Sequence, residues 1–97
     1  MRRLRVPDEV VSLVRTLHPN IKRKVRAALS EVLVDPRAGK ALKDELEGLR
    51  SYAVGRFRIV YREAPRERIE VIAIGPRASI YSETLRLVRR DRKGGAG

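Results

Sequence analysis

The sequence contains no cysteine and a single histidine, His18. Without thiols the chain cannot form a disulfide, a thiolate nucleophile or a zinc–thiolate site, and one histidine cannot build a histidine metal cluster. No apolar run approaches the roughly 20 residues of a membrane span, and the amino-terminal residues lack the apolar core of a signal peptide. We therefore expect a cytoplasmic protein without a metal, a cofactor or a membrane partner.

Acidic residues are also scarce. The 97 residues include 12 Asp and Glu against 23 Lys and Arg, which gives a formal net charge of +11 and a pI of about 11.2. Such a surplus is typical of proteins that bind nucleic acid or an acidic protein. Of the basic residues 18 are arginine, which suits bidentate contacts with phosphate or carboxylate, although a GC-rich genome would produce the same bias.

The first third of the chain predicts a short edge strand and two helices. Residues 3–6 alternate and end at Pro7, a residue that suits the first turn of a helix over residues 8–18. A second helix begins at Pro19, repeats apolar residues at helical spacing, and ends at Asp35-Pro36 because the residue before proline leaves the helical region.

In the remaining chain apolar and polar residues alternate with a period of two, as in β-strands. A polar connector with one helical turn over residues 41–45 precedes strands predicted over residues 49–54, 57–62 and 69–74, and a last helix begins near residue 78. This order predicts an α+β fold, with an N-terminal strand and helical hairpin packed on an antiparallel β-sheet meander and a short C-terminal helix. One domain is expected over residues 1–90, with a disordered tail over residues 91–97.

Arginines alternate along the second of these strands. If the strand is regular, Arg56, Arg58 and Arg62 share one face, whereas Phe57, Ile59 and Tyr61 face the helices. We expect the arginine face to be open, concave and wet, and to bind an anion. A charged edge strand that merely prevents aggregation would show the same pattern.

A second group of polar residues follows the last predicted strand. Gly75 and Pro76 end that strand and direct Arg77 outward, and Tyr81 lies about one helical turn further on, on the same side. One phosphate group can contact both side chains. The alternative is a helix-capping loop with Tyr81 in the core.

Three segments taken together resemble the RelE/ParE toxin superfamily of bacterial and archaeal toxin–antitoxin systems: residues 49–62, Ile74 to Arg77, and Ile80 to Glu83. The Asp-Pro end of the second helix and the connector after it agree, so the resemblance spans nearly the whole chain. The Arg-x-x-x-Tyr spacing of Arg77 and Tyr81 resembles the RelE branch, which cleaves mRNA on the ribosome, more than the ParE branch, which poisons gyrase.

Resemblance to RelE implies a metal-independent endonuclease. In the ribosomal A site the 2′-hydroxyl of mRNA attacks its own 3′ phosphate and leaves a cyclic phosphate. Arg58 would stabilise the transition-state charge, Arg77 would hold the phosphate and assist the leaving oxygen, and Tyr81 would orient the base or act as general base once its hydroxyl is sufficiently acidic. His18 is a weaker alternative base.

The same resemblance implies supporting contacts and partners. The basic residues expected to support phosphate binding are Arg50, Arg56, Arg62, Lys40 and Lys43. The implied partners are mRNA and ribosomal RNA, together with a cognate antitoxin that covers the basic face and forms a toxin–antitoxin oligomer.

The first hairpin strand departs from the family pattern. Ser51 and Ala53 stand where RelE-type toxins commonly carry Lys or Arg. If no other cation replaces them, the chain would be a weak nuclease or a plain RNA-binding module on the ribosome. Their neutrality also leaves open a ParE-like inhibitor of gyrase that uses no phosphate chemistry.

Overall fold

The structure, a computed structural model, describes residues 2–95, with side chains described for residues 2–90. In this part of the chain the elements are β1 (Arg3–Arg5), α1 (Asp8–Thr16), α2 (Pro19–Val34), β2 (Lys40–Ala41), the 3-10 helix η1 (Asp44–Leu46), β3 (Arg50–Val54), β4 (Phe57–Ala64), β5 (Arg68–Pro76) and α3 (Ile80–Gly95). Their order confirms the predicted strand, helical hairpin, meander and final helix.

The strands form one mixed five-stranded sheet in the order β1-β5-β4-β3-β2. β3, β4 and β5 make the predicted antiparallel meander, and β1 pairs in parallel with β5, so that Leu4 lies opposite Ile69. β2 extends the other edge, where Lys40 pairs with Ser51. The sequence predicted only a connector there, since two residues are too few to show an alternating pattern.

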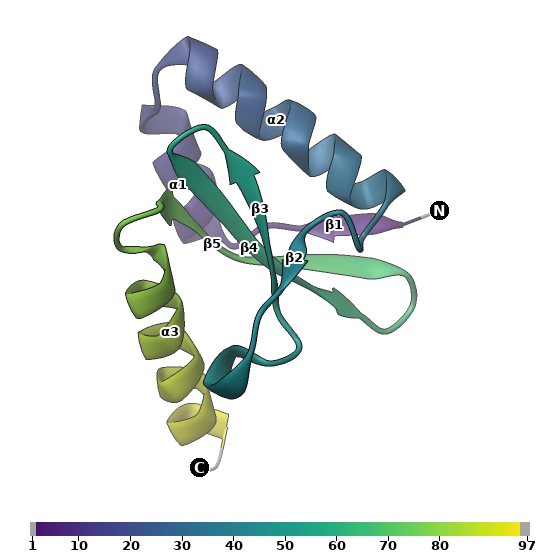
Figure 1. Cartoon of the computed structure of the whole chain (residues 1–97), viewed down its shortest axis with the longest axis vertical. Helices are drawn as coiled ribbons and strands as arrows, with labels where there is room; N and C mark the ends of the chain where they lie inside the picture. Colours follow the sequence, from purple (N-terminus) through teal and green to yellow (C-terminus); the bar gives the residue numbers. More distant parts are fainter. Residues whose placement is uncertain (1, 96–97) are drawn as a thin grey trace.

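The first hydrophobic core lies between the sheet and the helices α1 and α2 (Figure 1). Val25 and Val32 of α2 pack in it with Ile59 and Tyr61 of β4, and all four are fully buried. This confirms that Phe57, Ile59 and Tyr61 of β4 face the helical hairpin, as the alternation predicts.

The opposite face of the sheet is not open as predicted, because α3 covers its middle (Figure 1). Leu49, Val60 and Ala73 from the strands pack there against Ile80 of α3, and further apolar residues of α3 and the connector complete this second core. Alternation along β4 provides Val60, which lies between Arg58 and Arg62 and is fully buried. Because β4 carries apolar residues on both faces, each face must pack against another layer, and the apolar stripe of α3 supplies the second layer.

A β-bulge explains why β5 is apolar on both faces. The register between β4 and β5 shifts at Val60 and Tyr61, which face Ala73 and Val71, so Ile72 is the extra residue. Val71 therefore joins the first core, whereas Ile72 and Ala73 join the second. Simple alternation on a sheet without a bulge would not predict this division.

The Tyr61 hydroxyl fixes the loop that follows α2. It donates to the Pro36 carbonyl at 2.7 Å and accepts from the Gly39 N–H at 2.9 Å. Gly39 packs so closely on the ring that a Cβ atom added there would lie 2.5 Å from the Tyr61 hydroxyl oxygen. Only glycine fits, and the loop leads directly into β2.

The C-terminal helix, Ile80–Gly95, is longer than the short helix that the sequence predicts. Its helical assignment continues to Gly95, into the stretch 91–97 for which a disordered tail was predicted, and residues 96–97 lie outside the described residues. No helix within residues 2–95 is both long and apolar enough to cross a membrane.

The contacts of Tyr61 predict a stability loss on removal of its hydroxyl. Tyr61→Phe should lower the free energy of unfolding by about 1–3 kcal/mol, because two buried backbone groups lose their partner. Tyr52→Phe is the matched control: its hydroxyl donates to Glu31 at the surface, so the loss should stay below about 1 kcal/mol. Urea unfolding measures both variants, and equal losses would contradict the assigned role.

Alkaline pH provides a second test of the same group. Burial raises the pKa of Tyr61 above the ordinary value of 10.0, against the opposing effects of the Gly39 N–H and the Arg50 charge. Because folding favours the neutral hydroxyl, this stabilisation is complete below about pH 10 and is lost as the pH rises through the folded-state pKa. Unfolding free energies should therefore fall less steeply above about pH 10 for Tyr61→Phe than for the wild type; parallel curves would refute this linkage.

Candidate phosphate-binding site

Two loops meet at one corner of the sheet, the β3–β4 turn and the β5–α3 connection. Gly55, with a φ of +58°, makes the tight turn that the sequence predicts. The Arg77 N–H donates to the Arg56 carbonyl at 2.8 Å and ties the two loops together. Both residues line an open hollow with Gly55, Pro76 and Ala78. The fold thus brings Arg56 and Arg77 to one place, as a phosphate site requires.

Arg58 lies beside this corner on the same face as α3. Its half-buried guanidinium donates from Nη1 to the carbonyls of Phe57 at 3.1 Å and Gly55 at 3.3 Å. On the neighbouring strands its partners are the small residues Ala53 and Gly75, and Ile80 and Glu83 of α3 lie over Gly75. A guanidinium has five N–H donors, so most of them stay free for an anion.

Tyr81 reaches the same face from the first turn of α3. Its hydroxyl oxygen lies 3.0 Å from Ser51 Oγ, at hydrogen-bond distance, and 38% of the residue is exposed. Ser51 itself is buried. The serine that departs from the family pattern therefore holds the tyrosine, and the predicted alternative of a tyrosine buried in the core is wrong.

Lys40 is placed to replace one missing cation. It lies directly opposite Ser51 in the β2–β3 pair, and opposite residues in such a pair point to the same face. Lys40 is exposed at this sheet edge. Lys43 is also exposed, at the start of η1, but the described contacts do not bring its side chain to the corner.

Two predicted phosphate contacts are engaged elsewhere. Arg50 faces the opposite side of the sheet from Ser51, and its Nη1 donates to the Gly39 carbonyl at 2.8 Å. Arg62 is paired with Glu70, at 2.8 Å between Nη2 and Oε1. The sequence could not separate these arginines from Arg58, because the register, the loop over Tyr61 and the Glu70 partner are all tertiary features.

His18 has a structural role in this fold. It precedes α2, and its Nδ1 accepts from the Asn20 N–H at 3.1 Å, as a helix N-cap does. This contact ties the imidazole to the junction between α1 and α2, on the other side of the sheet from α3.

Sequence reasoning did not single out the carboxylate of Glu83. It lies in the first turn of α3, where the helix dipole favours an acid, and its Oε2 is 3.7 Å from the position of a Cβ atom built on Gly75. Gly75 is the strand partner of Arg58, so an acid borders the site. Among the described residues no three His, Asp or Glu side chains gather as metal ligands.

The fold and the corner define a small α+β protein in which Arg56 and Arg77 line an open hollow, while Arg58 and Tyr81 lie on the sheet face that carries α3. Residues 8–81 match the family model described as the ParE toxin of the type II toxin–antitoxin system parDE. This match covers most of the chain, which therefore belongs to the ParE toxin family within the RelE/ParE superfamily. The predicted superfamily is confirmed, and the protein is a toxin of a type II toxin–antitoxin system.

Solved toxin structures share this fold. The chain is 25% identical to a chain of the RelBE2 toxin–antitoxin complex of Mycobacterium tuberculosis, with a TM-score of 0.68 over 78% of this chain and 98% of that chain. A mutant of the Escherichia coli toxin RelE in the free state has a TM-score of 0.73 at 19% identity, over 93% and 96% of the two chains. YafQ from E. coli has a TM-score of 0.61 at 15% identity, over 84% and 99%. No curated protein sequence matches the chain.

The placement of the arginines predicts that one substitution weakens phosphate binding without changing stability, and that another lowers stability without changing binding. Arg77→Ala should weaken the binding of the dinucleotide uridylyl-uridine about fivefold, which corresponds to the roughly 1 kcal/mol of a partly exposed charged hydrogen bond, and should leave unfolding unchanged. Arg50→Ala should leave binding unchanged and lower the unfolding free energy by about 1 kcal/mol, since Gly39 loses a donor.

NMR titration and urea unfolding measure these two quantities on the same samples. If Arg50→Ala weakens binding as much as Arg77→Ala, the corner is not the anion site. If neither changes binding, the hollow does not bind phosphate.

Proposed function

We propose that this toxin is a RelE-like, ribosome-dependent mRNA endonuclease. The observation that carries the proposal is the meeting of the β3–β4 turn and the β5–α3 connection, which brings Arg56 and Arg77 together beside Arg58, on the sheet face where Ser51 holds the partly exposed Tyr81. Two cations and an aromatic side chain suit one phosphate and one base of a single-stranded message.

In the proposed reaction the 2′-hydroxyl of a nucleotide attacks the adjacent 3′ phosphate. A bond forms between the 2′-oxygen and phosphorus, the bond to the 5′-oxygen of the next nucleotide breaks, and a 2′,3′-cyclic phosphate and a free 5′-hydroxyl result. Arg58 stabilises the charge that develops on the phosphate, and Arg77 holds the phosphate beside the leaving oxygen. Tyr81, held by Ser51, stacks on the base.

The proton of the attacking hydroxyl needs an acceptor at this corner. Tyr81 carries one candidate oxygen and Glu83 another, and they lie on different sides of the first turn of α3 because they are two positions apart in the helix. The corresponding proton donor to the leaving oxygen is Arg77 or water bound to it. Substitution of each acceptor separately identifies which of them takes the proton.

An antitoxin is the second proposed partner. The similar RelBE2 and E. coli RelBE structures are toxin–antitoxin complexes. The net charge of +11 makes an acidic antitoxin segment the complementary partner for this chain. A neighbouring short reading frame that encodes an acidic protein is the expected source.

A second candidate function is a ParE-like inhibitor of gyrase. The matching family model is the ParE toxin, and the neutral residues Ser51 and Ala53 lack the cations that RelE-type toxins carry on this strand. Such a toxin needs a protein-binding surface and no phosphate chemistry. A non-catalytic RNA-binding module is a third candidate, and it predicts binding that falls steeply with salt.

The decisive experiment adds the purified protein to ribosomes programmed with a defined message. We expect cuts at codon boundaries with 2′,3′-cyclic phosphate ends. Arg77→Ala should slow cutting by about a hundredfold, the usual loss on removal of a group that stabilises the transition state. Tyr81→Phe keeps the stacking ring and loses only the hydroxyl that Ser51 holds, so it should cause a loss of this size only if that hydroxyl accepts the proton. Arg15→Ala, an exposed α1 arginine, is the matched control and should cut normally.

The remaining outcomes separate the candidates. An intact message together with linearised plasmid DNA in treated cells would replace the proposal with the gyrase function. Ribosome binding without any cyclic-phosphate product would leave only the RNA-binding module. In a cutting protein, a larger loss in Glu83→Gln than in Tyr81→Phe would assign the proton acceptor to the carboxylate.

A further inference from the structure

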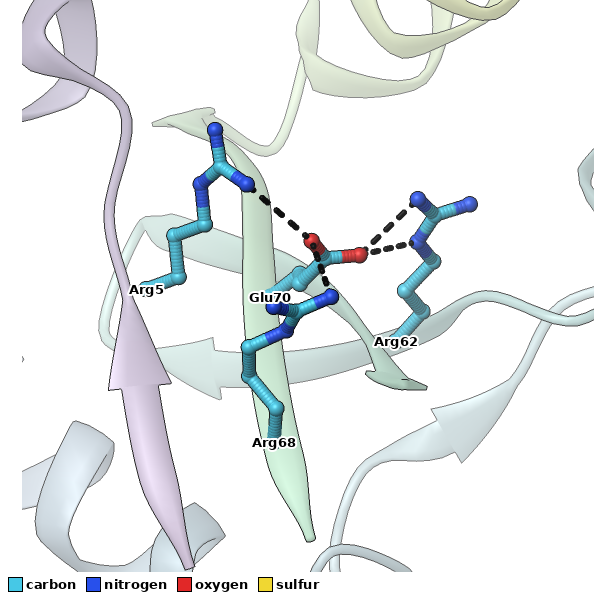
Figure 2. A network of polar contacts seen from close by, with 4 residues as sticks. All are labelled: Arg5, Arg62, Arg68 and Glu70. Carbon is cyan, nitrogen blue, oxygen red and sulfur yellow. Dashed lines mark hydrogen bonds and ion pairs between the residues drawn. The ribbon is translucent and has the colours of Figure 1, made fainter. Parts of the chain in front are cut away.

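A cluster of arginines surrounds Glu70 on the face of the sheet that carries α3 (Figure 2). Arg62 donates to Glu70 Oε1 from Nε at 2.9 Å and from Nη2 at 2.8 Å. Arg5 and Arg68 approach Oε2 at 3.8 Å and 3.6 Å. These residues come from β4, β1 and β5, and we call Arg5, Arg62 and Arg68 with Glu70 the arginine cluster.

The register of the sheet builds this cluster. Arg5 of β1 and Arg62 of β4 both lie opposite Glu70 of β5, so the three side chains form one row across neighbouring strands. Their neighbours Leu4 and Ile69 point to the first core. The cluster therefore faces away from α1 and α2, and the buried Val60 separates its Arg62 from Arg58 along β4.

The charges within the cluster do not balance. One carboxylate faces three guanidiniums, whose side chains are 70%, 53% and 43% exposed for Arg5, Arg62 and Arg68, whereas that of Glu70 is 13% exposed. Each guanidinium offers five N–H donors and the carboxylate only two oxygens, so most donors remain directed to solvent. The mostly buried Glu70 needs a cationic partner, and Arg62 supplies one with two contacts of 2.9 Å and 2.8 Å, whereas Arg5 and Arg68 stay 3.6 Å or more away. A stabilising role therefore does not account for three arginines held around one acid.

We propose that the arginine cluster is a docking surface for the phosphate backbone of double-stranded RNA, separate from the corner site. Glu70 holds the guanidiniums in a row before the RNA binds, which lowers the entropy cost of ordering them. The choice of RNA rests on the proposed function, since a toxin that cuts mRNA on the ribosome meets folded RNA there.

The composition of the cluster favours backbone contacts over the recognition of bases. It contains no aromatic side chain on which an unpaired base could stack, and single-strand binding sites usually rely on such stacking. Arginines that contact phosphates position a partner without reading its sequence. Double-stranded RNA presents phosphates and 2′-hydroxyls along an accessible minor groove.

The surroundings set the extent of the surface. Arg3 lies opposite Arg68 on β1 and extends the row on the same face. Arg66 continues it at the exposed β4–β5 turn, with a left-handed φ of +65° that is uncommon for a residue with a side chain. Toward α1 the row ends at Asp8 and Glu9, which line a hollow beside Arg5.

The test measures the binding of a fully paired RNA hairpin to the intact chain over a range of salt concentrations. The triple variant Arg5→Ala, Arg62→Ala, Arg68→Ala should reduce the slope of log K against log salt by about two to three, since each neutralised phosphate contributes roughly 0.7–0.9. The matched control removes the same charge from the exposed arginines of α1 and α2, as Arg15→Ala, Arg23→Ala, Arg26→Ala, and should leave the slope unchanged.

The variant Glu70→Gln distinguishes two explanations of RNA binding: guanidiniums held in place by Glu70, and attraction that depends only on net charge. The substitution adds one positive charge to the net charge, so unspecific attraction predicts tighter binding. The proposal predicts binding about fivefold weaker, because the guanidiniums are no longer held in a row. Circular dichroism and urea unfolding verify that each variant is folded.

Two results would overturn the proposal: equal slope changes in the two triple variants, or tighter binding by Glu70→Gln. Poly-glutamate can be added as a competitor for hairpin binding. If it competes more strongly than unlabelled RNA does, and only while Arg5 and Arg62 are present, the surface binds an acidic protein instead. Arg77→Ala should keep full hairpin binding, so a failure of message cutting and a failure of this docking surface are distinguishable.

Discussion

The structure depends on the burial of both faces of the central strands. β4 and β5 direct Ile59, Tyr61 and Val71 to one side of the sheet and Val60 and Ala73 to the other. Apolar residues on both faces of a strand require a layer on each side. The helices α1 and α2 supply one layer and α3 supplies the other. Because α3 must lie over Val60, its first turn brings Tyr81 to Ser51, and Arg58 and Arg62 lie on either side of Val60 along β4.

Arginine serves three purposes here, and the partner of each guanidinium distinguishes them. Arg50 donates to the Gly39 carbonyl and holds the loop that Tyr61 also fixes. Arg58 bonds the turn carbonyls and keeps donors free at the corner. Arg62 is directed by the carboxylate of Glu70. A net charge of +11 alone indicates an acidic partner, but the positions of carbonyls and carboxylates determine where that partner can bind.

Much of the fold is predictable from local patterns. The helical spacing in α2, its end before Pro36, the turn at Gly55 and the strand period of β4 are features of short segments, and all appear in the structure. The errors concern long-range features. β2 is recognisable only by its pairing with β3, and the bulge in β5 only by its register against β4. The open face was predicted because the helical hairpin was expected to cover one face of the sheet, and the predicted short C-terminal helix was not assigned to the other.

For the candidate site, too, local sequence patterns predict some features and long-range contacts decide the others. The sequence by itself determined the family, the number and kind of cations, and the spacing of Arg77 and Tyr81, because motif order and periodicity are local properties of the chain. Only the tertiary structure decided that Arg77 meets Arg56, that Ser51 holds Tyr81, and that Arg50 and Arg62 belong to other contacts. Strand register and helix coverage select the neighbours of a side chain, and both depend on residues far apart in the sequence.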